Sequence, residues 1–137
     1  MAKYLTEVLE EINNDVKKIN DYKEDAALRF IFEYAFDEDK KMDLPEGEPP
    51  FKPDGAPLGM TPANLRMETK KLYVYTRKDL KPIRKEQLFI GLLEAVHPDE
   101  AKLLIAIKDQ TLNKLYPKIT RKLLEGTGFI KPKTKDA

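Results

Sequence analysis

The sequence has 137 residues, of which 41% are hydrophobic and 36% are charged, and its formal net charge is only +1. This length and composition suit one globular domain and exclude a disordered chain. The absence of cysteine excludes a disulfide framework and a thiolate metal site, and no apolar run approaches the roughly 20 residues of a membrane helix.

The charge is divided unevenly along the chain. Residues 1–60 hold 8 basic and 15 acidic side chains, a net charge of −7, whereas residues 61–137 hold 17 basic and 9 acidic side chains, a net charge of +8. This asymmetry predicts an anionic partner for the second half. The alternative is that the two halves pack together and neutralise each other internally.

Two helices are predicted in the first part of the chain. Apolar residues recur at helical spacing over about 3–19, which indicates one amphipathic helix. Asp21 and Glu24 have the spacing of a capping box. The run AALRFIFEYAF, apolar nearly all round, follows them and predicts a buried, central helix over about 22–36.

A proline-rich segment follows, and residues 37–61 show no helical period. The stretch LPEGEPPFKPDGAPLGMTPANL holds six prolines and three glycines, which favours a stiff, extended loop that we call the strap. Its apolar anchors are Phe51, Leu58 and Met60. They are expected either to fill the core of this chain or to bind a partner, which would be a second copy of the chain or a host protein.

Thr61-Pro62 has the residue types of a helix start, with threonine as N-cap and proline in the first turn. We therefore predict a helix over about 62–78, although its segment LYVYT alone is typical of a strand. The dipeptide Lys81-Pro82 predicts the start of another helix.

Further helices are expected from His97-Pro98 onward, where proline is followed by two acidic residues in the first turn. Gly126 is the expected C-cap of the last helix. The complete prediction is an all-α, compact, bundle-like domain of five to seven helices over 1–130. It includes the strap at 37–61 as a long ordered loop, and residues 131–137 form a flexible basic tail.

Most catalytic chemistries are excluded by what the sequence lacks. It has no serine or cysteine nucleophile, one histidine, no G-x-G-x-x-G motif and no Walker A loop. His97 is interpreted as a helix-boundary residue, with a general base as the alternative. The acids around Asp37–Asp43 do not match an EF-hand loop. We therefore expect no enzyme, no metal and no cofactor.

One basic segment is the main candidate for function. Cations follow one another closely between 66 and 85, and on an α-helix several of them share a face with an aromatic ring. Phosphate contacts and base stacking need such a face. The predicted nucleic-acid-binding residues are Arg66, Lys70, Tyr73, Arg77, Lys78, Arg84 and Lys85. A solvated charged face is the alternative interpretation.

The strap sequence and the later stretch RKEQLFIGLLEAVHPDEAKLLIAIKD resemble a family of small uncharacterised proteins of T4-like tailed bacteriophages, including marine ones. The resemblance covers nearly the whole chain. It implies a phage-encoded protein in the cytoplasm of a bacterial host. No activity is assigned to that family, so the resemblance implies no catalytic residues. The N-terminus also lacks the apolar core of a signal peptide, which agrees with a cytoplasmic location.

Overall fold

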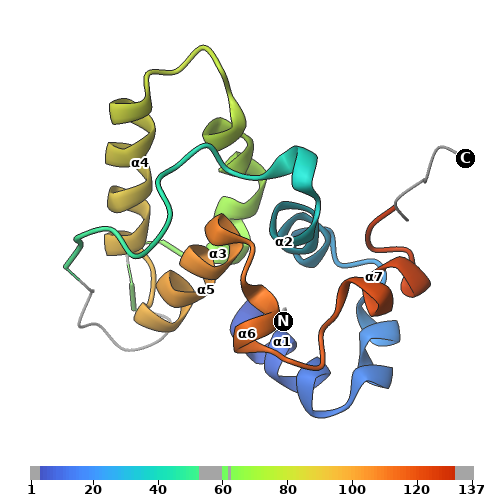
Figure 1. Ribbon diagram of the computed structural model, residues 1–137. Helices are drawn as coiled ribbons and strands as arrows, with labels where there is room; N and C mark the ends of the chain where they lie inside the picture. The colour runs from blue at the N-terminus through green and yellow to red at the C-terminus, as the bar shows by residue number, and fades with distance from the viewer. Residues whose placement is uncertain (1–3, 53–59, 62, 132–137) are drawn as a thin grey trace, which may run out of the picture.

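The computed structural model describes residues 4–52, 60–61 and 63–131, and within them every regular element is a helix (Figure 1). The predicted all-α class is therefore confirmed. The α-helices and the 3₁₀-helices, labelled η, follow in the order α1 (Leu5–Asn14), η1 (Val16–Tyr22), α2 (Ala26–Phe36), η2 (Glu38–Lys40), α3 (Leu65–Glu68), η3 (Thr69–Thr76), α4 (Pro82–Ala95), α5 (Pro98–Asp109), α6 (Leu112–Leu115) and α7 (Arg121–Thr127).

Helices α2 and α5 form the centre of the molecule, and the other elements pack around them (Figure 1). Leu28, Ile31 and Phe32 of α2 are fully buried, as are Leu104 and Ile107 of α5. Each such side chain contributes about 1.5–3 kcal/mol when it leaves water. The prediction of a buried, central helix from AALRFIFEYAF is thus confirmed.

The helix predicted over 3–19 is two elements. Helix α1 ends at Asn14, and the side chain of Asp15 then accepts a hydrogen bond from the backbone N–H of Lys17 at 3.2 Å to start η1. Asparagine and aspartate bond readily to nearby backbone groups, so the run Asn13-Asn14-Asp15 competes with the helix.

Two predicted helix ends are also shifted. Helix α2 begins at Ala26 with Asp25 as N-cap, because the Asp25 carboxylate accepts from the N–H of Leu28 at 3.2 Å, so the Asp21–Glu24 pair is not its cap. At the other end of the chain the C-cap is Gly128, with φ of 83°, whereas Gly126 lies inside α7. Only a glycine takes this left-handed conformation at little cost.

The starts of α4 and α5 agree with the sequence. Pro82 and Pro98 occupy the first turn of each helix. The His97 ring caps α5, since its Nδ1 accepts from the N–H of Asp99 at 3.1 Å. This confirms the helix-boundary interpretation of His97.

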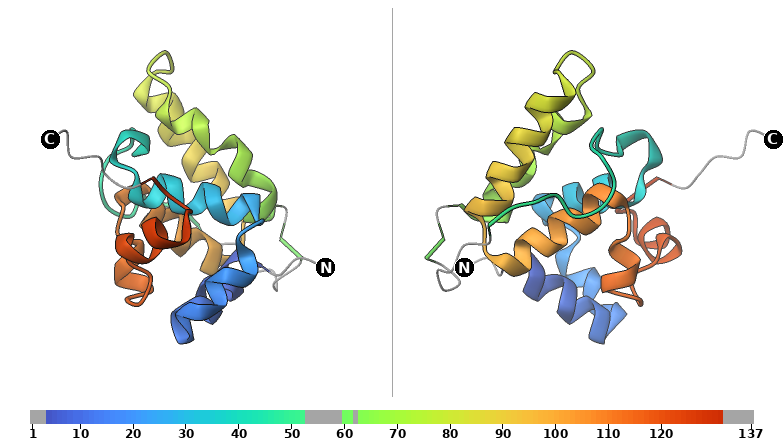
Figure 2. Two further views of the ribbon diagram at one scale, coloured as in Figure 1. Left: turned by 90° about the vertical axis from the view of Figure 1, so that its right-hand side faces the viewer. Right: turned by 60° about the vertical axis from the view of Figure 1, so that its left-hand side comes forward.

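Elements α3, η3 and α4 form an antiparallel hairpin that projects from the body of the molecule (Figure 2). The N–H of Ala63 donates to the carbonyl of Ala95 at 2.8 Å and closes its base. The helix predicted over 62–78 begins only at Leu65, with Asn64 as N-cap, so Thr61 is not the cap. Its second part is 3₁₀-helical rather than α-helical, and the alternative of a strand is wrong.

Candidate binding surface on the η3–α4 hairpin

Three of the predicted nucleic-acid-binding cations have partners inside the molecule. The first is Arg66, whose Nη1 lies 2.8 Å from both carboxylate oxygens of Asp25. Asp25 is at the same time the N-cap of α2. Arg66 therefore ties the base of the hairpin to α2, which is a structural role and removes it from a free basic face.

Lys85 is the second, and its side chain is only 1% exposed. Its Nζ donates to Asp43 Oδ2 at 2.6 Å and to the carbonyl of Arg77 at 2.8 Å. The hydrogen bond and the charge of Lys85 hold the pKa of the Asp43 carboxyl below its ordinary value. Because a buried ammonium cannot reach a phosphate in solvent, we remove Lys85 from the predicted site.

Arg77 is the third. Its guanidinium donates to Asp79 from Nε at 2.9 Å and from Nη2 at 2.5 Å, and this bond raises the pKa of Arg77. The side chain stays 46% exposed at the turn of the hairpin. Its charge is therefore partly neutralised but still reaches solvent.

The remaining predicted residues stay on the surface but do not form one row. Lys70, Lys78 and Arg84 are exposed and make no ion pair with the described residues, and Tyr73 is 52% exposed. With three residues per turn, Lys70 and Tyr73 share one row of η3, whereas Arg77 follows the helix as its C-cap, with an extended backbone. The stripe expected from α-helical spacing is therefore divided.

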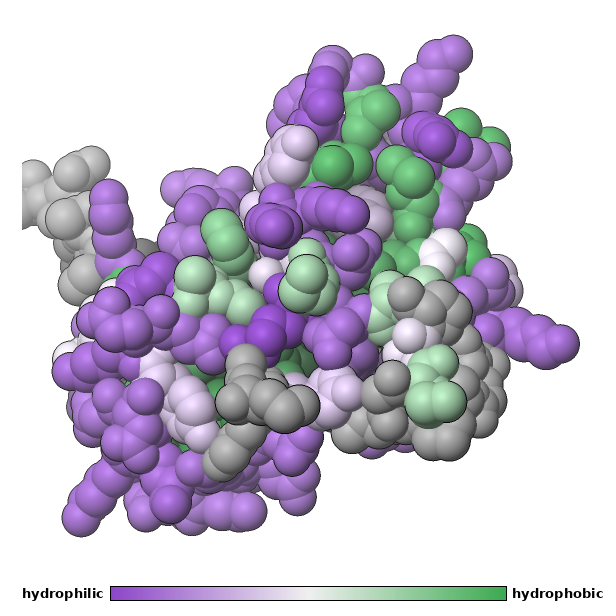
Figure 3. Space-filling view, turned by 180° about the vertical axis from the view of Figure 1, so that it is seen from behind, coloured by the Kyte–Doolittle hydropathy of each residue, from purple (hydrophilic) through white to green (hydrophobic). Residues whose placement is uncertain are grey.

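A groove of about 420 Å³ runs between η3 and α4. Figure 3 shows apolar side chains gathered over this hairpin, at the upper right of the view. A buried floor and half-buried walls give the groove a largely apolar surface. It is lined by Glu68, Lys71, Leu72, Val74 and Tyr75 on one side, and by Gln87, Leu88, Gly91, Leu92 and Ala95 on the other.

Gly91 lies in the middle of α4 and opens onto this groove. A Cβ added there would meet no atom within 4 Å, so no packing inside the described chain requires a glycine. Glycine in a helix interior is about 0.5–1 kcal/mol less favourable than alanine. Gly91 therefore makes α4 less stable than alanine would, and the absence of a side chain leaves the groove open at this position.

The sequence contains a signal for this groove that our predictions did not include. Leu88, Leu92 and Ala95 flank Gly91 at helical spacing and form a second apolar face of α4. The first face, Phe89 and Leu93, is fully buried against the body. Periodicity alone does not distinguish an apolar face that packs internally from one that faces solvent.

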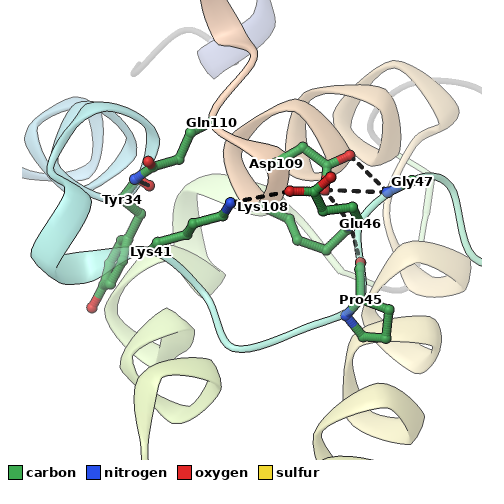
Figure 4. Close-up of polar contacts among 8 residues, drawn as sticks. All are labelled: Tyr34, Lys41, Pro45, Glu46, Gly47, Lys108, Asp109 and Gln110. Atoms are coloured by element: carbon green, nitrogen blue, oxygen red, sulfur yellow. Dashed lines mark hydrogen bonds and ion pairs between the residues drawn. The ribbon is translucent and has the colours of Figure 1, made fainter.

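The described part of the strap lies along this chain's own helices. Lys108 Nζ donates to the carbonyl of Pro45 at 2.7 Å, and the Asp109 carboxylate accepts from the N–H of Gly47 at 3.1 Å (Figure 4). Lys108 is only 2% exposed. These bonds hold residues 45–47 against the C-terminal end of α5.

The three predicted anchors of the strap differ in their surroundings. Phe51 is half-buried and packs against the core of its own chain, which favours the first of the two interpretations. Met60 is 73% exposed and contacts solvent. Leu58 lies outside the described residues. Phe51 is therefore not available as a docking residue while the strap is held in this way.

Glu100 is a buried carboxyl at the base of the hairpin that the sequence did not indicate. Its Oε2 accepts from the N–H of Leu65 at 3.2 Å, and its Oε1 has no hydrogen-bond partner among the described residues. Burial raises the pKa of Glu100, against the lowering effect of the backbone N–H groups of Leu65 and His97. The sequence predicts only that this residue is an acid in the first turn of the helix after His97.

Comparison with known proteins adds one finding. A model of one protein family matches residues 6–114. The chain belongs to the family of unknown function DUF6433. The part that matches DUF6433 contains the strap, the hairpin and the groove, and it ends before α7. No curated protein and no solved structure matches the chain.

Two searches of the described residues bear on other functions. No group of three or more histidine, aspartate or glutamate side chains is placed to hold a metal ion there. In the same part of the chain, each helix is too short or too polar to cross a membrane.

Proposed function

We propose that this protein is a non-enzymatic interaction module that binds a protein segment in the groove between η3 and α4. The open, apolar groove at Gly91 carries this proposal. Contiguous exposed apolar surface with polar residues at its rim marks interaction sites, and a groove between two helices suits an amphipathic helix.

The surface proposed here differs from the one that the sequence indicated. Partner binding through Phe51, Leu58 and Met60 of the strap was one of two alternatives that the sequence left open. Phe51 packs on its own core, and the strap is bonded to α5, so the partner does not need to displace it. A second copy of the chain remains a candidate partner, and so does a host protein. The phage resemblance stays a prediction.

A displayed peptide library tests the proposal, because it assumes no partner. The library holds amphipathic peptides of about 16 residues, long enough to lie along the roughly 21 Å of the 14-residue α4. The wild-type protein should retain a set of peptides, and Gly91→Gln should weaken their binding at least about tenfold, because a side chain then fills the groove. Fluorescence anisotropy with the selected peptides measures this change.

Gly126→Gln is the matched control. Gly126 also lies inside a helix with open space at its Cβ, but in α7, away from the groove. Peptide binding should survive this substitution. The proposal is wrong if the wild type retains no peptide, or if Gly91→Gln binds the selected peptides as well as the wild type does.

Nucleic-acid binding remains a second candidate, because cations gather at the turn of the hairpin. Lys78, Lys81 and Arg84 are exposed there and make no ion pair with the described residues. We expect single- or double-stranded DNA to bind at about 50 mM salt and to dissociate steeply as salt rises.

The double variant Lys78→Glu with Arg84→Glu should reduce the dependence of log Kd on log salt by about 2, since two phosphate contacts are lost. Lys122→Glu, an exposed lysine of α7, is the control. The absence of DNA binding at about 50 mM salt rejects this candidate and leaves the groove proposal unaffected.

A further inference from the structure

The two ends of the hairpin that forms the groove differ in charge. At the turn of the hairpin lie Lys81 and Arg84, both exposed and without an ion pair among the described residues. At the base, Lys71 pairs with Glu68 at 3.5 Å. Glu94 keeps its negative charge there, because its partner at 2.8 Å is the neutral backbone N–H of Lys52. An occupant of the groove therefore meets unbalanced positive charge at one end only.

The first turn of α4 strengthens this positive field. No side chain caps the helix at Lys81, and its first turn contains no acidic residue. The helix dipole places partial positive charge at the same end as the two cations. This arrangement is unfavourable for α4 alone and is relieved by a carboxylate from outside.

The geometry of α4 connects this charge with the groove. Arg84, Leu88, Gly91 and Ala95 follow at intervals of four, three and four residues and lie on one face of the helix. A helix placed over Gly91 and Ala95 would extend along Leu88 toward Arg84. One bound helix would then make apolar contacts at the middle of the groove and charged contacts at its end.

We propose that the occupant is an acidic amphipathic helix of a partner protein, with its apolar face in the groove and its carboxylates beside Lys81 and Arg84. This inference rests on the proposed function. A second copy of this chain fits less well, because its own acidic amphipathic helix, α1, has Leu5, Leu9 and Ile12 fully buried. A nucleic acid fits the turn but has no apolar face for the groove.

The peptide library tests this inference directly. In these peptides the positions outside the apolar stripe are randomised among glutamate, glutamine and lysine. The apolar stripe is the same in all of them. Peptides retained by the wild type should be enriched in glutamate over lysine, and their affinity should fall as salt rises. The double reversal Lys81→Glu with Arg84→Glu should weaken them at least about tenfold and shift the selection toward lysine. Lys118→Glu with Lys122→Glu reverses two exposed charges elsewhere and should do neither.

The outcomes separate the two proposals. If selected peptides are neutral or basic, or if the double reversal has no effect, the acidic partner is wrong and the groove stands. If no peptide is retained, the groove itself is wrong. If light scattering shows a dimer that Gly91→Gln dissociates, the occupant is a second copy, which overturns the inference. If DNA displaces a bound acidic peptide, the peptide contacts the same cations as DNA, as the inference requires. If DNA binds at these cations and no acidic peptide does, the inference fails.

Discussion

At the scale of single residues, Glu100 makes the stability of this protein depend on pH. Its folded-state pKa is raised above the ordinary 4.5, chiefly by burial, so the folded state binds this proton more strongly than the unfolded chain does. The stability gained from protonation is fully present below the ordinary pKa and is lost as pH rises through the folded pKa. Glu100 therefore lowers the free energy of unfolding at neutral pH.

Glu100→Gln should remove this contribution, because a neutral amide of the same shape still accepts from the N–H of Leu65. We expect the variant to be more stable than the wild type at pH 7, with a difference that shrinks toward about pH 4.5. Urea unfolding at several pH values measures it. Because the interaction with His97 lowers the pKa of Glu100, the comparison is repeated with His97→Asn, which keeps a capping side chain. A difference that does not change with pH contradicts the prediction.

Residue-level expectations succeeded where the cause was local. Pro82 and the His97 cap act within one helical turn, so the sequence shows both the signal and its effect. The burial of Lys85 and Lys108 could not be predicted in this way. Charged side chains are normally exposed. These two are buried because Asp43 and Pro45, far away in the sequence, accept hydrogen bonds from them, and Lys108 also pairs with its neighbour Asp109.

At the scale of elements, the hydrophobic period located the helices but not always their type. The run TKKLYVYT folds as η3, in which Thr69, Leu72 and Tyr75 recur every third residue and are buried. Aromatic and β-branched residues have weak α-helical propensity, so contacts with the body decide the geometry of this segment. The predicted nucleic-acid-binding residues were placed on one face by α-helical spacing. On a 3₁₀-helix the same residues do not all share a face, so they lie apart in the structure.

The candidate groove shows a second limit of pattern reading. α4 has an internal apolar face with Phe89 and Leu93, and a groove face with Leu88 and Leu92. Both faces are made of the same residue types. Only the position of η3 decides that one of them stays accessible, and that position depends on long-range bonds such as that between Arg66 and Asp25.

At the scale of the whole molecule, the acidic half of the chain neutralises the basic half only in part. The ion pairs Arg66–Asp25 and Lys85–Asp43 join the basic half to the acidic half, as the alternative of internal neutralisation expected. Lys81 and Arg84 nevertheless keep an unbalanced positive charge at the turn of the hairpin. The asymmetry therefore contributes to the fold through these two ion pairs, and the charges of Lys81 and Arg84 stay exposed at the turn of the hairpin.

The C-terminal segment also belongs to the fold, although the match to DUF6433 ends at residue 114. The ring of Phe129, 1% exposed, packs edge-on against Phe32 of α2, with centroids 5.1 Å apart. The guanidinium of Arg29 lies 5.1 Å from the centre of the same ring and donates to the carbonyl of Gly128 at 2.9 Å. This segment therefore closes the core over α2.

Phe129→Ala should accordingly lower the free energy of unfolding by about 3–5 kcal/mol, the range for removing a buried phenylalanine. Because folded domains have only about 5–15 kcal/mol in total, a chain that stops at residue 114 should not fold. Urea unfolding followed by circular dichroism measures both. Tyr73→Ala, which removes an exposed ring, should change stability by less than about 0.5 kcal/mol. If Phe129→Ala lowers the free energy of unfolding as little as Tyr73→Ala does, the matched region folds without the C-terminal segment. In that case α7 and Phe129 are an addition to the fold and not part of its core.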